Sequence, residues 1–377
     1  MDFQFTPDQT ALLKMVQEVV TKEIIPYAHE MDEKATIRPE LIQQLHNAGL
    51  LNLTVPEEYD GPGLDALTIA FIYEQLGRGD AGVATSVAAN ALASYPVLTT
   101  GTHEQKQYFF NFLNEGKLAA FALTEPGAGS DAGSVATAAV KDGDDYILNG
   151  TKCFITNGGL ADIFVVFANA RKSAGIRGLT AFIVDRNTPG FSVGKHEDKM
   201  GIRSSNTCEL ILDHVRVPSS RRIGKEGHGF KIAMKTLDSA RPFVGAVSIG
   251  LAQAAFDFAV KYARERQQFG KAIASFQLVQ AMIADMGMKL ESARLLVYKA
   301  CWMKEQGLSF SKEAAMAKCL ASDTAMQITT DAVQVVGGYG YSKEYPVERY
   351  MRDAKIMQIY EGTNQIQRLV IGNHILY

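Results

Sequence analysis

The sequence predicts an α+β protein of several domains, with helices in the first and last thirds of the chain and strands in the middle. At 377 residues the chain exceeds the size of one ordinary hydrophobic core. Apolar residues recur at helical spacing in both outer thirds, whereas short β-rich runs fill the part between them. We therefore expect an N-terminal helical domain over residues 1–117, a β domain over residues 118–225 and a helical bundle over residues 226–377.

The first helix is predicted to begin at Thr6, because Thr at the N-cap, Pro7 at the first helical position and Gln9 at the third form a capping box. A second helix ends at Gly49. The Ala-rich apolar sequence over residues 66–98 predicts two buried helices.

The middle segment contains apolar, β-branched runs at residues 146–150, 163–167, 179–184 and 209–212. Turns rich in Gly, Asn and Asp separate them, and no helix-length pattern lies between them. This arrangement favours an antiparallel barrel or sandwich over βαβ units. Three long helices are then expected over residues 239–268, 276–307 and 311–336, and helices of this length usually pack as a bundle, often across subunits.

Composition excludes several function classes. The formal net charge is −3, from 38 basic and 41 acidic side chains, so general electrostatics does not favour a nucleic-acid partner. The four cysteines show no Cys-x-x-Cys pair and read as buried thiols rather than disulfides or a zinc site. The N-terminus lacks the pattern of a signal peptide, and no apolar run is expected to cross a bilayer.

Near the C-terminus, Glu361 is followed by Gly362, Thr363, Asn364 and Gln365. One carboxylate backed by small and hydrogen-bonding residues suits a base beside a bound cofactor, because Gly allows close approach and Thr and free N–H groups can donate. An ordinary turn leading into a helix N-cap explains the segment equally well.

The segment from Thr124 to Asp131 reads Thr-Glu-Pro-Gly-Ala-Gly-Ser-Asp. Its glycines have the wrong spacing for a dinucleotide fingerprint and no helix is predicted after it, which excludes a Rossmann NAD site. The loop is either a ligand-binding loop or a plain β-turn loop.

Three further segments allow a ligand or a structural interpretation. Phe154 and Thr156 share one strand face and could wall a planar ring, or could be core residues. The basic cluster at Arg266 could clamp a pyrophosphate, or cap a helix. The Gly-Gly-Tyr-Gly run at residues 337–340 has more glycines than helix termination needs.

Taken in order, five motifs resemble those of the flavin-dependent acyl-CoA dehydrogenases. They are Thr-Glu-Pro-Gly-Ala-Gly-Ser-Asp, Phe-Ile-Thr-Asn-Gly, Arg-x-Gln-Phe-Gly-Lys, Gln-x-x-Gly-Gly-Tyr-Gly and Tyr-Glu-Gly-Thr-Asn-Gln. The resemblance covers essentially the whole chain, including Met1-Asp2-Phe3 and the Lys-Met-Gly-Ile-Arg segment at Lys199. It is closest to bacterial short- and medium-chain enzymes of the butyryl-CoA type.

The resemblance implies a C-terminal four-helix bundle, a homotetramer, and FAD held between the β domain and the bundle, with a neighbouring subunit completing the site. The implied FAD contacts in the β domain are Phe121, Leu123, Thr124, Gly129, Ser130, Phe154, Ile155 and Thr156. Those in the helical part are Arg266, Gln268, Phe269 and Gln277, with Gln334, Gly337 and Gly338 from the neighbouring subunit, and Thr363 and Gln365 beside the base. Gln268 stands where many relatives have Thr.

The implied reaction is α,β-dehydrogenation of an acyl-CoA thioester, in which Glu361 takes the α-proton and the β-carbon passes a hydride to flavin N5. The implied substrate-binding residues are Ser130, Asp238, Arg241, Tyr360, Glu361 and Gly362. Some relatives carry the base at the position of Ala240, which cannot act as one here. The implied oxyanion donors are the Glu361 N–H and a ribityl hydroxyl of FAD.

The resemblance also implies that an electron-transfer flavoprotein accepts the electrons and that the acyl group is short to medium in length. Branched, cyclic or aryl acyl groups, enoyl-CoA reduction, an oxygen-using oxidase and a non-catalytic nucleic-acid-binding relative stay open as alternatives. A cytoplasmic location is expected, with a mature mitochondrial matrix form as the alternative.

Overall fold

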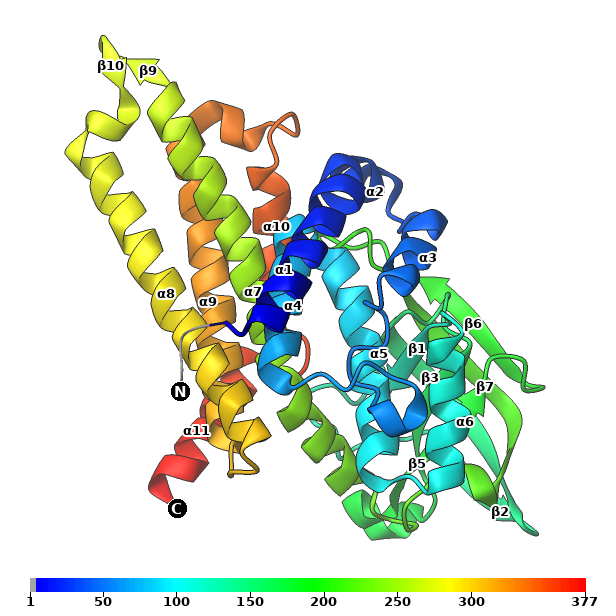
Figure 1. Cartoon of the computed structure of the whole chain (residues 1–377). Coiled ribbons are helices and arrows are strands. Elements are labelled where there is room, and N and C mark those ends of the chain that lie inside the picture. Colours follow the sequence, from blue (N-terminus) through cyan, green and yellow to red (C-terminus); the bar gives the residue numbers. More distant parts are fainter. Residues whose placement is uncertain (1–4) are drawn as a thin grey trace.

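The computed structural model describes residues 5–377, and its elements follow the expected order of helices, strands and helices. The opening residues Met1-Asp2-Phe3, which carry part of the family resemblance, lie outside the described part. Figure 1 shows the N-terminal helices between the strands on one side and the long C-terminal helices on the other. The N-terminal helices therefore pack against the sheet on one side and against the C-terminal helices on the other.

The N-terminal helices are α1 (Pro7–Val19), α2 (Ala28–Lys34), α3 (Pro39–Asn47), α4 (Ala66–Gly79), α5 (Ala81–Thr100) and α6 (His103–Asn114). The predicted capping box is present, because the Thr6 hydroxyl accepts from Gln9 N and the Gln9 amide oxygen accepts from Thr6 N. The two predicted buried helices are α4 and α5. They are separated at Asp80, whose carboxylate caps α5 by accepting from Val83 N.

The strands are β1 (Ala119–Ala122), β2 (Ala138–Asp142), β3 (Asp145–Thr156), β4 (Ile163–Asn169), β5 (Leu179–Asp185), β6 (Phe191–His196), β7 (Thr207–Pro218) and β8 (Arg222–Ile223). They form one sheet in the order β6-β7-β3-β2-β4-β5-β8, and β1 pairs with β4. Pairings along this path are antiparallel as predicted, except that β1–β4 and β2–β4 are parallel. The prediction was wrong at these two pairings because the chain between the partners, which includes β2 and β3 for β1–β4 and β3 for β2–β4, supplies the long crossover that parallel strands need.

The C-terminal helices are α7 (Gly229–Glu265), α8 (Gln277–Glu305), α9 (Ser311–Val336), α10 (Val347–Met357) and α11 (Asn364–Leu376), and the short strands β9 (Gln267–Gln268) and β10 (Lys271–Ala272) join α7 to α8. The bounds of α9 match the prediction, and those of α8 differ by one or two residues. Helix α7 begins ten residues before the predicted start at residue 239. It continues through Pro242, which has no N–H to donate to the Asp238 carbonyl.

Two expectations drawn from composition can be checked. Cys153, Cys208, Cys301 and Cys319 are all buried and unpaired, as predicted. The expectation that no apolar run is long enough to cross a bilayer was wrong. Helices α5 and α7 are both long enough and apolar enough to do so, judged by length and composition alone. Their most apolar windows are 83% and 72% buried inside the molecule, which is the burial of core helices.

Helix α5 connects the two halves of the molecule. It packs against α7 on one side and against β1 on the other. The Asn90 side chain donates to the Leu51 carbonyl (3.0 Å) and accepts from Ala119 N (2.9 Å), so a buried polar group ties α5 to the first strand. The sheet is therefore fixed relative to the bundle through this helix.

A buried ion pair fixes the loop between β1 and β2. Lys152 Nζ lies 2.6 Å from Glu125 Oε1, and both side chains are buried. Glu125 also accepts from Ala136 N (2.7 Å) and Thr137 N (3.0 Å), while Lys152 donates to the Leu123 carbonyl (3.2 Å). Burial lowers the pKa of Lys152 to about 8, against the opposing effect of the Glu125 charge. The loop that contains the predicted glycine motif is thus held at both ends.

We predict that Lys152→Met destabilises the protein by about 3–5 kcal/mol, because it leaves the Glu125 carboxylate buried without its cation. Urea unfolding followed by circular dichroism measures the loss. The matched control is Lys195→Met, which removes the exposed lysine of the ion pair between β6 and Glu197 and is expected to cost less than about 1 kcal/mol. Equal losses in the two variants would contradict this role of the buried pair.

Candidate active site

The Glu361 loop connects α10 to α11 in an unusual backbone conformation. Glu361 has φ = 52° and Gly362 has φ = 93°, so two consecutive residues are left-handed. Glycine adopts this conformation freely, but for a glutamate it costs on the order of 1–3 kcal/mol and persists only where the surroundings impose it. Strain of this kind at a single carboxylate is typical of functional sites.

Side chains from α9 and α11 hold the carbonyls of this loop. Lys318 Nζ donates to the Gly362 carbonyl (2.8 Å), and Gln367 Nε2 donates to the same oxygen (2.9 Å) and to the Glu361 carbonyl (3.2 Å). Asn364 N donates to the Gln358 carbonyl (2.9 Å), which closes the loop. These bonds fix the direction in which the Glu361 side chain leaves the backbone.

The Glu361 side chain is half-buried, and one of its two carboxyl oxygens is fully enclosed. Its Oε2 atom is buried and has no hydrogen-bond partner among the described residues. Burial raises the pKa of Glu361 to about 7, although the positive charges of Lys318 and Arg241 act in the opposite direction. A carboxyl group that titrates near neutral pH is suited to act as a general base.

Other unpartnered polar atoms belong to residues that face Glu361. The Tyr73 hydroxyl, Arg241 Nε and Gln367 Oε1 are all buried, and they have no hydrogen-bond partner within residues 5–377. Arg241 bonds Asp238 through its Nη1 atom (2.5 Å), so part of its guanidinium is committed and part is free. Buried polar atoms are nearly always paired in native proteins. Their concentration here fits a place that a polar ligand completes.

Helix α5 brings the end of β3 to the same region. The Tyr360 hydroxyl lies 3.4 Å from Thr85 Oγ1, and Asn157 Nδ2 donates to the carbonyl of the next residue, Ser86 (2.9 Å). The Glu361 loop and the turn after Thr156 are therefore attached to successive residues of one helix. The structure brings together the second and the last of the predicted motifs.

The β-domain residues predicted to hold FAD fit a planar ligand. The Phe154 side chain is 64% exposed and its φ is 56°, so the alternative that it is a core residue is wrong. Cys153 N donates to the Thr124 carbonyl (3.0 Å), which joins the two predicted loops. A Cβ atom added at Gly129 would meet no atom within 4 Å, so the chain leaves open space there.

Other predicted β-domain contacts are less available. The Leu123 and Ile155 side chains are buried in the core, so only their backbone groups can reach a ligand. Phe121 packs against Phe167, with ring centroids 4.9 Å apart, and Ser130 is exposed. In the sequence, Phe121 precedes and Ser130 follows Glu125, which forms the buried ion pair with Lys152.

The remaining predicted FAD residues lie at the far end of the helices. Arg266, Gln268, Phe269 and Gln277 are exposed on the α7–α8 connection, and Gln334, Gly337 and Gly338 are exposed where α9 ends. The Arg266 guanidinium carbon is 5.8 Å from the Tyr339 ring centroid, so these two groups adjoin each other. Within residues 5–377 no hydrogen bond or ion pair links them to the Glu361 loop. One chain thus presents the predicted cofactor residues as two separate sets.

The residues directly after the predicted base have different surroundings. Thr363 is the N-cap of α11, where its hydroxyl accepts from Ile366 N (3.3 Å). Gln365 is exposed on the first turn of that helix. The N-cap interpretation of this segment is therefore correct for Thr363, and it coexists with the unpartnered carboxylate of Glu361.

Sequence reasoning missed Lys318 and Tyr73. Lys318 lies within the Ala-rich sequence of α9, with Ala314, Ala315 and Ala321 on the same buried face. A charged residue at a core position of a periodic pattern was the available signal. Tyr73 stands in an apolar run and carried no comparable signal.

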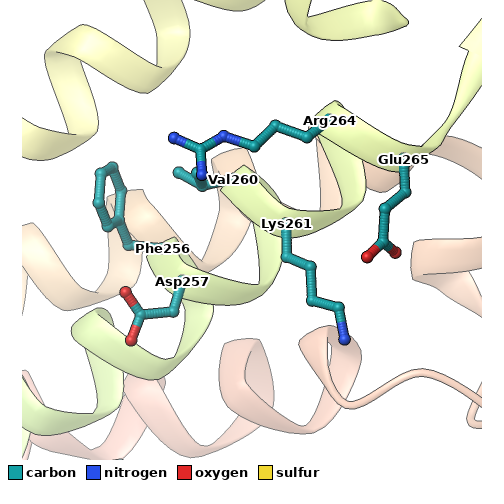
Figure 2. Close-up of a pocket in the computed structure, with 6 residues that line it drawn as sticks. All are labelled: Phe256, Asp257, Val260, Lys261, Arg264 and Glu265. Atoms are coloured by element: carbon teal, nitrogen blue, oxygen red, sulfur yellow. The ribbon is translucent and has the colours of Figure 1, made fainter.

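A depression of about 390 Å³ lies elsewhere, along the outer face of α7. Figure 2 shows the residues that line it, all on that one helix: Phe256, Asp257, Val260, Lys261, Arg264 and Glu265. It contains none of the predicted site residues. The candidate site is therefore defined by the Glu361 loop and not by this depression.

Comparison with known proteins agrees with the motifs. Models described as the N-terminal, middle and C-terminal domains of acyl-CoA dehydrogenase match residues 6–117, 120–215 and 227–376. A short-chain specific acyl-CoA dehydrogenase of Megasphaera elsdenii is 49% identical over 382 residues, covering 100% of both chains. The solved butyryl-CoA dehydrogenase of M. elsdenii and a chain from work on the electron transferring flavoprotein of Acidaminococcus fermentans each align with a TM-score of 0.98, 49% identity and full coverage of both chains.

We predict that Glu361→Gln raises the melting temperature relative to the wild type at pH 8 more than at pH 5. The folded-state pKa of Glu361 lies above its unfolded value, so the stability that protonation contributes is present at low pH and is lost as pH rises through about 7. The amide of Gln does not titrate. Differential scanning fluorimetry from pH 5 to 8 measures the gap, with the exposed Glu58→Gln as control. A gap that does not change with pH would contradict the burial argument.

Proposed function

The chain belongs to the acyl-CoA dehydrogenase family, and from this premise we propose that it oxidises short-chain acyl-CoA thioesters with Glu361 as the catalytic base. The reaction converts the thioester to the trans-2-enoyl-CoA, and FAD is the cofactor. The observation that carries the assignment of Glu361 is a carboxylate with one buried, unpartnered oxygen, in a strained loop near two cations.

The α-proton of a thioester is too weakly acidic for a carboxylate in water, so the site must lower the barrier in two ways. Burial makes Glu361 a stronger base than an exposed glutamate. The thioester oxygen must also be stabilised as negative charge develops on it. Within residues 5–377 the Glu361 N–H donates no hydrogen bond, so it is free for that oxygen.

The cofactor site is formed, in this proposal, by two chains. Thr124, Phe154 and Thr156 would hold the ring system, while Arg266 with the glycines after α9 of a neighbouring subunit would hold the pyrophosphate end. The separation of these two sets within one chain supports a shared site in a homotetramer. When bound, FAD supplies the acceptor for the hydride that leaves the β-carbon.

A short acyl group is favoured by the aromatic side chains beside Glu361. Tyr73 and Phe243 are buried with ring centroids 5.3 Å apart, and Tyr95 stacks on Phe243 at 6.5 Å. Lys304 Nζ lies 2.5 Å from the Tyr95 hydroxyl and 4.9 Å from the Phe243 ring centroid, so it packs against both aromatic side chains. The pKa values of Tyr73 and Tyr95 are raised by burial and, to a smaller extent, by the Glu361 charge, so both hydroxyls lie near the base.

The remaining features of the proposal follow from the family. We propose that an electron-transfer flavoprotein reoxidises the enzyme, in a cytoplasmic setting. The change from helix to strand at Ala119 and back to helix at Gly229 supports domains over residues 1–117, 118–225 and 226–377. The CoA arm would contact Ser130, Asp238 and Arg241.

We predict that Glu361→Gln keeps bound FAD and still binds butyryl-CoA, but slows anaerobic flavin bleaching by about 10²–10⁴-fold, because general-base catalysis typically contributes this much. Stopped-flow absorbance measures bleaching, and equilibrium dialysis measures binding. The exposed Glu58→Gln serves as the control with wild-type bleaching. Bleaching of Glu361→Gln at the wild-type rate would remove Glu361 as the base.

We predict that Phe243→Ala raises the ratio of kcat/KM for hexanoyl-CoA to that for butyryl-CoA by at least about 10-fold, because one methylene in an apolar pocket changes this quantity by about 10–200-fold. Phe256→Ala, which alters a phenylalanine on the outer face of the same helix, should leave the ratio unchanged. Phe243→Leu repeats the test with a smaller loss of packing. An unchanged ratio in both Phe243 variants would show that this residue does not limit chain length.

A further inference from the structure

Lys318 is a buried lysine whose ammonium group has an unusual set of partners. Its side chain has no exposed surface, and it takes part in no ion pair among the described residues. Its Nζ donates to the Gly362 carbonyl (2.8 Å) and to Asn364 Oδ1 (2.9 Å). The buried Lys152, by contrast, lies 2.6 Å from a carboxylate. Burying an ammonium without a carboxylate is costly, so its retention needs a reason.

The partners of Lys318 are themselves held in place. Asn364 Nδ2 donates to Asp323 Oδ1 (2.7 Å) and to Ser322 Oγ (2.9 Å), and Gln358 Nε2 donates to the same Asp323 oxygen (2.7 Å). Both ends of the Glu361 loop are thereby attached to one face of α9. In this network Lys318 is the charged group that donates to the Gly362 carbonyl, which also accepts from Gln367 Nε2.

Charged groups from three helices surround the base. Lys318 on α9 and Arg241 on α7 are the cations that act on the Glu361 carboxylate. Asp323 and Cys319 lie on α9 beside Lys318, and Arg368 on α11 is paired with Asp323 (2.6 Å). The Asp323 carboxylate is therefore paired with Arg368, whereas the positive charge of Lys318 favours the ionised form of Glu361.

We infer that Lys318 is a positioning residue for proton abstraction. Its ammonium holds the Gly362 carbonyl so that Glu361 keeps its left-handed conformation, and its charge favours the ionised form of the Glu361 carboxylate. The inference rests on the proposed function, in which Glu361 is the base.

The test is the pH dependence of anaerobic flavin bleaching by butyryl-CoA in Lys318→Met, Lys318→Gln and Lys318→Arg. Removing the positive charge disfavours the ionised carboxylate, so the rising limb of the rate should move to higher pH by about one unit or more in the Met and Gln variants. At a pH below both limbs, that shift lowers the rate about 10-fold. Lys318→Arg keeps the charge and should retain the wild-type limb. Ser322→Ala breaks a neighbouring hydrogen bond without removing charge and should also retain it.

A second readout isolates proton abstraction. Acetyl-CoA has no β-carbon, so exchange of its methyl hydrogens in D2O, followed by NMR, proceeds without hydride transfer. We expect this exchange to slow in Lys318→Met and Lys318→Gln by a factor similar to that for bleaching. A purely structural role would lower the melting temperature and leave the pH limb in place.

The outcomes separate this inference from the proposed function. A wild-type pH limb in folded Lys318→Met or Lys318→Gln overturns the role of Lys318, and the Gln variant decides if the Met variant does not fold. Wild-type bleaching by Glu361→Gln overturns the proposed base instead. Loss of bleaching in Glu361→Gln together with unshifted Lys318 variants leaves the function standing and removes only Lys318.

Discussion

The chemistry proposed for this protein depends on one carboxylate that has a buried, unpartnered oxygen and lies near two cations. Glu361 lies in a loop that neither neighbouring helix could fix alone, since α10 ends before it and α11 begins after it. Burial raises its pKa, and Lys318 and Arg241 limit the rise. The balance between these effects places the pKa of this carboxyl group near 7, which suits the base proposed above. Much of the packing among α7, α9 and α11 can be understood as support for this balance.

Three buried lysines illustrate three ways of tolerating a cation in a core. Lys152 is paired with Glu125, Lys304 lies over the rings of Tyr95 and Phe243, and Lys318 points at a loop carbonyl and an amide oxygen. Burial lowers the pKa of all three to about 8. Each adjoins a different part of the proposed site: Lys152 the glycine loop, Lys304 the aromatic side chains proposed to limit the acyl chain, and Lys318 the loop of the proposed base. Buried positive charge is therefore a recurring means of organising this active site.

Local patterns could be predicted from sequence, and tertiary relationships could not. The Thr6 capping box and the bounds of α9 follow from nearest-neighbour chemistry and periodicity, which the chain carries within a few residues. The motif around Glu361 could be predicted because the carboxylate and the small and hydrogen-bonding residues after it are adjacent in sequence. The parallel β1–β4 pairing, the early start of α7 and the role of Lys318 depend on which distant segments meet. No local pattern encodes those meetings.

The pairing of β1 with β4 has a consequence for how the chain acquires its structure. Ala119 aligns with Ile163, 44 residues later (163 − 119), and Asp145 aligns with Pro218, 73 residues later (218 − 145). Contacts of such separation form slowly because a long loop must close first. During synthesis the first strand leaves the ribosome well before its partner exists, and the sheet cannot be completed until β7 and β8 have emerged. Until then, the apolar strands on either side of the glycine loop have unpaired edges. Strands of different chains must be kept from pairing with each other during this time, because exposed strand edges promote aggregation.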